Sequence, residues 1–258
     1  MGQGPPLVIT TGALQGRASV RVLAAALADR ATVHVWDRRG RGDSGGTPDP
    51  AVDPLGPGGD ALVAAEVADL AAVTAAATDR AGGTPGHYAH SAGAALALEA
   101  VMRGVPAARV VAHEPPWRLP GPPADPRDAL AAVTLAALRD GRPGDAAATF
   151  LGGFPAAAPA PVERLRTTPF WAGTVALAPS LPHDVALVVR DVLPADRLAH
   201  LAVPLLALDG GASPAWVRDA VAALAAAVPG ARHRTLPGQE HFVVPSVLAP
   251  VLAEFLLG

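Results

Sequence analysis

Short apolar runs that end at glycine or proline alternate along most of this chain with longer, alanine-rich segments of helical period. Such short runs are typical of buried strands, and the longer segments are typical of helices that return the chain to the start of a sheet. The alternation predicts an α/β fold, a mostly parallel sheet flanked by helices. The predicted strands are Leu7–Thr11, Thr32–Trp36, Gly86–His90, Val110–His113, Pro204–Leu208 and Arg232–Leu236; the predicted helices are Ser19–Arg30, Asp60–Arg80, Ala92–Arg103, Pro214–Val228 and Pro245–Leu257.

The alternation stops between Arg118 and Leu201, where proline and glycine are frequent. Two stretches of helical period remain in this region, Asp128–Asp140 and Pro182–Val192. The alternative is a disordered insertion, which its apolar content disfavours. We therefore predict a helical cap subdomain at residues 118–201, inserted into a core domain that residues 1–117 and 202–258 form.

Two missing residue types narrow the chemistry of this 258-residue chain: it has no cysteine, and its 20 basic residues are all arginine. The first absence excludes disulfides, thiolate nucleophiles and cysteine-bound metals. The second excludes Schiff-base chemistry and the lysine of a P-loop. We expect neither a metal nor a cofactor.

The net charge is −3, and the arginines are scattered rather than gathered in a stripe, so nucleic acid is not an expected partner. The N-terminal segment has no basic stretch before its apolar run, and no window reaches the roughly 18 apolar residues of a membrane span. We expect a cytoplasmic protein that binds a small molecule and no membrane. The sequence leaves open whether it forms a homodimer.

The segment "GHYAHSAGAALALEA" (residues 86–100) runs from a short strand through Ser91 directly into a helix. This small-x-Ser-x-Gly pattern is that of a nucleophile elbow, with Ala89 where the first glycine is usual and Gly93 in place. The turn strains the serine backbone and places it at a helix N-terminus, where the amide of Ala92 can face an oxyanion. The alternative is that Ser91 only caps the helix. Upstream, "VITTGALQG" ends a strand and offers the amide of Ala13 as a second donor.

The chain outside the predicted cap carries four further patterns: "VWDRRGRGDSG" (residues 35–45), "AHSAGAALALEA" (89–100), "EPPW" (114–117) and "LPGQEHFVVP" (236–245). Taken together, in order and spacing, these motifs resemble the α/β-hydrolase superfamily. The resemblance implies an eight-stranded, mostly parallel sheet, a cap after the sixth strand and the order Ser, acid, His along the chain. It also implies that this chain begins near the third strand, with the first two missing or altered.

A serine nucleophile needs a base, and in a chain without lysine or cysteine that base is a histidine. His241, between the last predicted strand and helix, matches the base of the family; the alternative is a solvated loop histidine. His87 and His90 are not expected to bind a metal, because three positions apart on a strand they face opposite sides. His90 resembles the residue that packs beside the family's nucleophile.

The acid of the triad does not stand at its usual position in this sequence, because Ser213 stands where most of the family has an aspartate. Ser213 is also predicted to cap the helix that begins at Pro214. Asp209 and Glu114 remain. Glu114 follows the sixth-strand equivalent, where haloalkane dehalogenases and zearalenone-type lactonases carry their acid. An acid there lies at the carboxyl edge of the sheet, so we predict Glu114; the alternative is a carboxylate paired with Arg118.

The resemblance implies acyl transfer by Ser91, His241 and Glu114, with Ala13 and Ala92 forming the oxyanion hole. The expected substrate is an ester or lactone of an apolar small molecule. A protein of the same fold that is a lyase, a cyclase or a ligand-binding receptor is the alternative, supported by the missing aspartate at Ser213. The aromatic residues expected to bind the substrate are Trp117, Phe150, Phe154, Phe170 and Trp171.

Overall fold

The computed structural model describes residues 1–121, 126–153, 162–189 and 192–258. Within these residues the chain forms one sheet of six parallel strands in the order β2-β1-β3-β4-β5-β6. The predicted parallel sheet is confirmed, and each predicted strand is present: β3, β4 and β6 have the predicted bounds, and β1, β2 and β5 differ by one or two residues at an end. The strands are β1 (Pro6–Thr10), β2 (Thr32–Val35), β3 (Gly86–His90), β4 (Val110–His113), β5 (Leu205–Gly210) and β6 (Arg232–Leu236).

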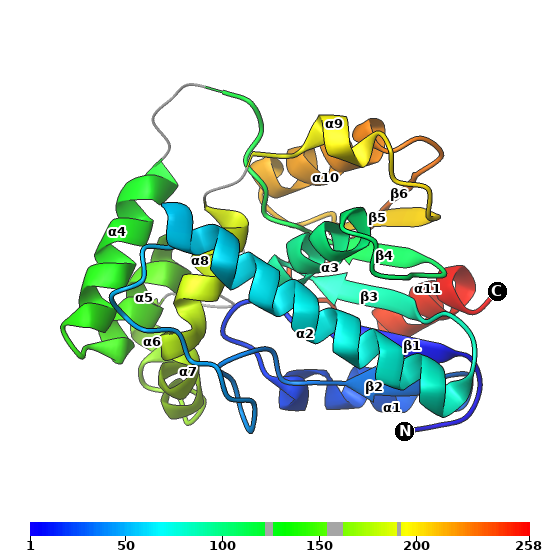
Figure 1. The fold of residues 1–258 in the computed structure, drawn as a ribbon, viewed down its shortest axis with the longest axis horizontal. Coiled ribbons are helices and arrows are strands. Elements are labelled where there is room, and N and C mark those ends of the chain that lie inside the picture. The colour runs from blue at the N-terminus through cyan, green and yellow to red at the C-terminus, as the bar shows by residue number, and fades with distance from the viewer. Residues whose placement is uncertain (122–125, 154–161, 190–191) are drawn as a thin grey trace.

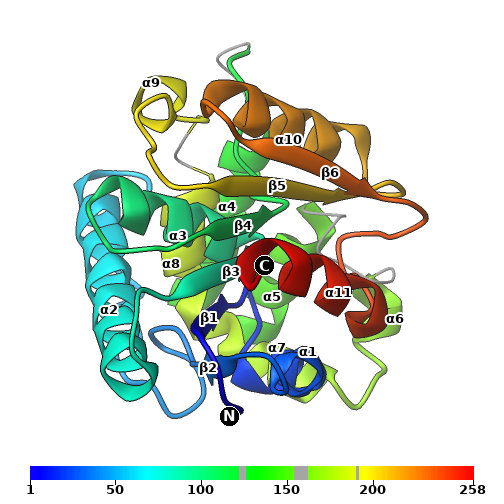
Figure 2. The same cartoon turned by 90° about the vertical axis from the view of Figure 1, so that its right-hand side faces the viewer.

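Helices cover both faces of the sheet (Figure 2). One face carries α1 (Arg21–Leu27) and α11 (Pro245–Leu256); the other carries α2 (Pro57–Ala81), α3 (Ala92–Met102) and α10 (Ala215–Ala227). A sheet covered on both faces needs strands that are apolar throughout, which explains the short continuous apolar runs in the sequence.

Successive residues of the central strands pack into two separate cores. Val8 and Ala112 belong to the core shared with α2, α3 and α10, whereas Ile9 and Val111 belong to the core shared with α1 and α11. Because all six strands are parallel, their carboxyl ends lie at one edge of the sheet, where the loops that follow them meet.

The resemblance implied eight strands, and the described residues form six. The inserted helices follow β4, so β4 takes the place of the sixth strand and β1 that of the third. The sheet therefore begins at the third strand, as the motif order predicted.

Helix α2 is long and apolar enough, by length and composition, to cross a membrane, which the expectation of no such window missed. Glu66 in the middle of this helix is buried and hydrogen-bonded to Arg38, and the helix packs against α3 and the inserted helix α8. We interpret α2 as a core helix of the layer over the sheet, because a core helix passes the same test of length and composition.

The described residues between β4 and β5 are largely helical, as predicted. Figure 1 shows α4 to α7 gathered beyond the carboxyl edge of the sheet, while α8 packs against α2 and α3, and α9 against α10. These helices are α4 (Pro126–Arg139), α5 (Pro143–Gly153), α6 (Val162–Leu165), α7 (Trp171–Leu177), α8 (Leu181–Val188) and α9 (Ala195–Leu198).

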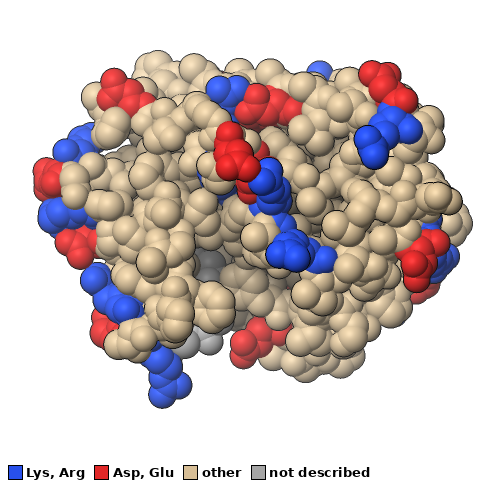
Figure 3. Space-filling view, turned by 90° about the horizontal axis from the view of Figure 1, so that it is seen from below, with Lys and Arg blue, Asp and Glu red and all other residues tan. Residues whose placement is uncertain are grey.

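Charged side chains are interspersed on the face seen in Figure 3. Arginine and acidic side chains lie there as small mixed groups among other residues, and no continuous field of one sign covers that face. The mixture agrees with the scatter of arginines along the sequence.

Candidate active site

Three residues other than glycine have positive φ in the described chain: Leu14 at 52°, Ser91 at 55° and Glu114 at 49°. They follow β1, β3 and β4, three adjacent strands, so all three lie at the carboxyl edge of the sheet. Such backbone is unfavourable for residues with a side chain and persists where the surrounding structure imposes it, often at functional sites. The strained positions coincide with the loops that the sequence motifs singled out.

Ser91 forms a sharp turn between β3 and α3, with φ 55° and ψ −127°. Its amide donates to the carbonyl oxygen of His113 (2.8 Å), and its side chain makes no capping hydrogen bond to α3. A Cβ atom at Gly93 would lie 2.5 Å from the carbonyl oxygen of Thr11, so only glycine lets α3 start this close to β1. The local geometry is that of a nucleophile elbow rather than of a serine cap.

The turn after β1, residues Thr11–Gln15, lies against Ser91; we call it the β1 turn. A Cβ atom at Gly12 would lie 2.9 Å from the Cβ of Ser91. The amide of Gly12 donates to the side chain of Gln15 (3.1 Å), whereas no hydrogen bond within the described residues occupies the amides of Ala13 and Ala92. These two amides are therefore available to a ligand oxygen, as the oxyanion prediction requires.

Glu114 and His241 form a buried pair, with Oε2 of Glu114 2.5 Å from Nδ1 of His241. The other carboxylate oxygen accepts hydrogen bonds from the amide of Gly210 (2.7 Å) and from the hydroxyl of Ser213 (2.6 Å). Burial alone would raise the pKa of Glu114, but hydrogen bonds and charge from His241, and then those two donors, outweigh it and lower the pKa below its ordinary value. The carboxylate is held ionised and aimed at the imidazole.

Ser213 does not cap α10, so that prediction is wrong. The N-cap position is Pro214, and the Ser213 hydroxyl is used by Glu114 instead. Because a carboxylate buried without donors is costly, Ser213 and Gly210 together stabilise Glu114 in its ionised form.

The other arrangements considered for the acid are not observed. Asp209 lies on β5 and is hydrogen-bonded to Nε2 of His233 on β6 (3.0 Å), which takes it away from His241. Arg118 is paired with Asp128 (2.9 Å). The carboxylate of Glu114 is thus hydrogen-bonded to His241, whereas Asp209 and Arg118 are paired with other residues.

Three buried histidines lie near this edge, His90, His113 and His241, whereas His87 is buried toward the amino end of β3. The His90 ring lies 4.3 Å from that of His241 and 4.9 Å from that of His113, measured between centroids, and its Nε2 lies 3.0 Å from the backbone oxygen of His241. His90 therefore packs behind His241, whereas the resemblance implied a place beside Ser91. No group of three or more His, Asp or Glu residues suited to a metal ion occurs among the described residues.

Burial keeps three of these histidines neutral. It lowers the pKa of His87 to about 4. Burial, followed by repulsion from His241, lowers the pKa of His113 to about 3. Burial, and then the charges of His241 and His113, also lower the pKa of His90. The rings of His90 and His113, whose centroids lie 4.3 Å and 6.4 Å from that of His241, are thus neutral neighbours of His241.

We expect the protein to lose stability as the pH falls from about 6.5. Below that pH, His87 and His113 bind protons in the unfolded chain but stay neutral in the folded protein, where their pKa values are lower. Each such histidine costs about 2 kcal/mol of unfolding free energy between pH 7 and pH 5. Urea denaturation at both pH values measures the loss. His87→Gln is expected to reduce it by about 2 kcal/mol, and His200→Gln, at an exposed position, to leave it unchanged. Equal stability of wild type at both pH values would contradict the expectation.

The aromatic residues predicted to bind substrate separate into two groups. Phe170 and Trp171, with Phe242, line a cavity of about 230 Å³ whose wall also includes Ala13. Trp117 and Phe150 are buried in the core that α2, α3 and α10 share, and do not line this cavity. Phe154 lies outside the described residues.

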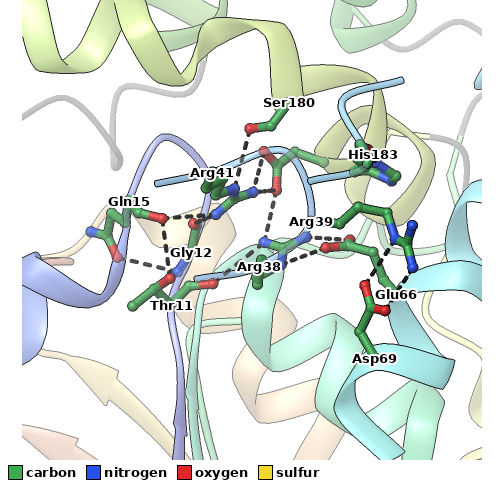
Figure 4. A network of polar contacts seen from close by, with 12 residues as sticks. Thr11, Gly12, Gln15, Arg38, Arg39, Arg41, Glu66, Asp69, Ser180 and His183 are labelled. Carbon is green, nitrogen blue, oxygen red and sulfur yellow. Dashed lines mark hydrogen bonds and ion pairs between the residues drawn. The ribbon is translucent and has the colours of Figure 1, made fainter. Parts of the chain in front are cut away.

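The loop between β2 and α2 contains two buried arginines, Arg38 and Arg41, to which the sequence motif assigns no role. Arg38 is bound by the carboxylates of Glu66 and Asp184, and Arg41 is bound by Asp184 and Ser180. Figure 4 shows the two guanidinium groups side by side next to the β1 turn. Their partners are distant in sequence, so only the run of three arginines within four positions hinted at this network.

The fold and the elbow define the class of this protein, and the comparisons agree. The alpha/beta hydrolase family model matches residues 12–252, and the chain belongs to that family. No curated protein sequence matches it.

Solved structures of hydrolases resemble the chain over nearly its whole length. An alpha/beta hydrolase from Sphaerobacter thermophilus DSM 20745 is 40% identical, with a TM-score of 0.84 over 98% of this chain and 93% of that one. A hydrolase from Pseudomonas aeruginosa PA01 is 21% identical, with a TM-score of 0.75 over 100% and 92%. The enol-lactonase from Burkholderia xenovorans LB400 is 17% identical, with a TM-score of 0.65 over 98% and 89%. At the two lower identities the likeness concerns the fold.

Proposed function

We propose that the protein is a serine hydrolase that cleaves an ester or lactone of an apolar small molecule through an acyl-enzyme. The observation that carries the proposal is the buried pair of Glu114 and His241 on the edge that also presents the strained Ser91. An ionised carboxylate on Nδ1 leaves Nε2 of the imidazole free to accept a proton, which is the state a general base needs.

The proposed reaction has two halves. The Ser91 oxygen attacks the substrate carbonyl while His241 accepts the hydroxyl proton, and the amides of Ala13 and Ala92 hold the oxyanion. The tetrahedral adduct collapses, and the leaving alcohol takes the proton from His241. Water then attacks the acyl-enzyme by the same route and releases the acid.

The substrate class rests on the cavity beside Ala13. Its wall is largely apolar, with Leu14, Phe170 and Trp171 among its residues, which suits an uncharged apolar acyl group. We propose that residues 118–201 act as the cap over this cavity and that the enzyme works on a small molecule in the cytoplasm. The soluble character typical of the fold supports this.

The alternative, a lyase, cyclase or ligand-binding protein, drew its support from the missing aspartate at Ser213. That position now has a different explanation, because its hydroxyl donates to Glu114. A hydrolase is therefore the better reading of the site.

Labelling by a fluorophosphonate probe tests the proposal, together with turnover of p-nitrophenyl acetate and butyrate. We expect wild type to be labelled and to turn over at least one ester, and Ser91→Ala to lose both. Ser246→Ala, at an exposed position on α11, is the matched control and should behave as wild type. A wild type that neither reacts with the probe nor turns over an ester would contradict the proposal.

A further inference from the structure

Two buried arginines, Arg38 and Arg41, donate hydrogen bonds to the backbone of the β1 turn. Nη1 of Arg41 donates to the carbonyl oxygens of Gly12 (2.5 Å) and Gln15 (3.0 Å), on either side of Ala13. Nη1 of Arg38 donates to the carbonyl oxygen of Thr11 (3.3 Å). These contacts fix the path of the β1 turn, in which Leu14, the residue after Ala13, has a strained positive φ.

The other side of Arg41 is bound by the inserted helices. Its Nη2 contacts both carboxylate oxygens of Asp184 (2.8 Å each), and its Nε donates to the hydroxyl of Ser180 (3.1 Å). Asp184 lies in α8, which continues from α7 through the short 3-10 helix Ala178–Ser180. Arg41 therefore lies between the β1 turn and the same helical segment that lines the cavity with Trp171 (Figure 4).

The charges of this network are balanced within the protein. Arg38 and Arg41 are matched by Glu66 and Asp184, and all four side chains are buried. Burial works to lower the pKa of Arg38, but Glu66 and Asp184 overcome it and raise the pKa. Such a network is costly to assemble and is a weak source of stability, which favours a role in fixing geometry.

We propose that Arg41 is a positioning residue for the oxyanion hole. It ties the backbone on both sides of Ala13 to Asp184 and Ser180, so the placement of the cap segment sets the direction of the Ala13 amide. The inference rests on the proposed hydrolase function. An amide must point at the place where the oxyanion forms, and losing one such donor costs about 10²–10³ in kcat.

The loop supplies a matched control for Arg41. Arg39, two positions earlier, pairs with the half-exposed Asp69, and within the described residues its side chain makes no hydrogen bond or ion pair with the β1 turn or with α8. Both residues are arginines of one loop with one carboxylate partner each to lose. A loss of general loop stability affects both variants, whereas a loss of oxyanion alignment affects Arg41 alone.

The experiment compares Arg41→Lys, Ser180→Ala and Arg39→Lys on p-nitrophenyl butyrate. We expect Arg41→Lys to lower kcat and the rate of fluorophosphonate labelling by about 10–100-fold, with KM and the pH midpoint of kcat near wild type. We expect Ser180→Ala, which removes the hydroxyl that accepts from Nε of Arg41 and donates to the backbone oxygen of Leu177, to lower kcat by about threefold to tenfold and to fold normally. Arg39→Lys should stay within about twofold.

Hydrogen exchange of the peptide that contains residues 11–15 is the second measurement. It should be faster in Arg41→Lys and Ser180→Ala, and unchanged in Arg39→Lys. The inference is overturned if kcat of folded Ser180→Ala and Arg41→Lys stays within twofold of wild type, or if Arg39→Lys falls as far. A wild type without esterase activity or labelling would instead sink the proposed function, so the two failures are distinct.

Discussion

Glu114→Gln is expected to lower kcat on p-nitrophenyl butyrate by about 10⁴, with KM changed by no more than a few fold. The amide of Gly210 points at one oxygen of the side chain and cannot turn away, so a glutamine must present its carbonyl oxygen to Gly210. Its NH₂ group then faces Nδ1 of His241, which must accept rather than donate. The imidazole proton is left on Nε2, the wrong tautomer for a base.

Asp209→Asn is the matched comparison, because Asp209 is the other buried carboxylate that could have been the acid. Its partner is His233, so we expect kcat and KM within about threefold of wild type. Each variant replaces one carboxylate oxygen by an NH₂ group, and the two positions lie at the carboxyl ends of the adjacent strands β4 and β5. A collapse of turnover in Asp209→Asn with normal turnover in Glu114→Gln would reverse the assignment of the acid.

His241→Ala is expected to lower kcat by about 10⁶, as much as Ser91→Ala does, and the double variant should lose little more. The two side chains act in one proton transfer, so removing either abolishes the same step. What remains in each single variant is the contribution of binding and of the two oxyanion amides. Steady-state turnover of p-nitrophenyl butyrate measures all three variants.

His200→Ala is the control for His241→Ala. His200 is exposed, follows α9, and contacts the backbone of Asp196, so turnover should not change. His241→Ala must first be shown to fold, since it removes a buried ring that packs on His90. Additive losses in the double variant, or a folded His241→Ala with more than a tenth of wild-type activity, would contradict the proposed role.

Much of the fold could be predicted because it depends on local order. The apolar runs that became β1 and β4 are continuous since both faces of the sheet are covered, and Gly93 and Ser91 mark a turn that few other residues tolerate. The insertion after β4 was visible as a break in the alternation. The six strands followed from the apolar runs rather than from the family's usual count of eight.

The remaining features depend on contacts between distant segments. The sequence favoured Glu114 over Asp209 as the acid, and the contact of the Glu114 carboxylate with His241, 127 positions later, forms only in the folded chain. The local sequence predicted that Ser213 caps a helix, yet its hydroxyl donates to the carboxylate of Glu114, which follows β4. Arg41 and Asp184 are 143 positions apart.

By itself, the sequence determined the parallel sheet, the elbow at Ser91 and the loop of His241, because short-range period and turn chemistry encode them. Only the tertiary structure decided which carboxylate meets the imidazole and what holds the β1 turn. Those choices depend on the direction of side chains at the ends of adjacent strands, and on buried charges that find partners only after the chain has folded.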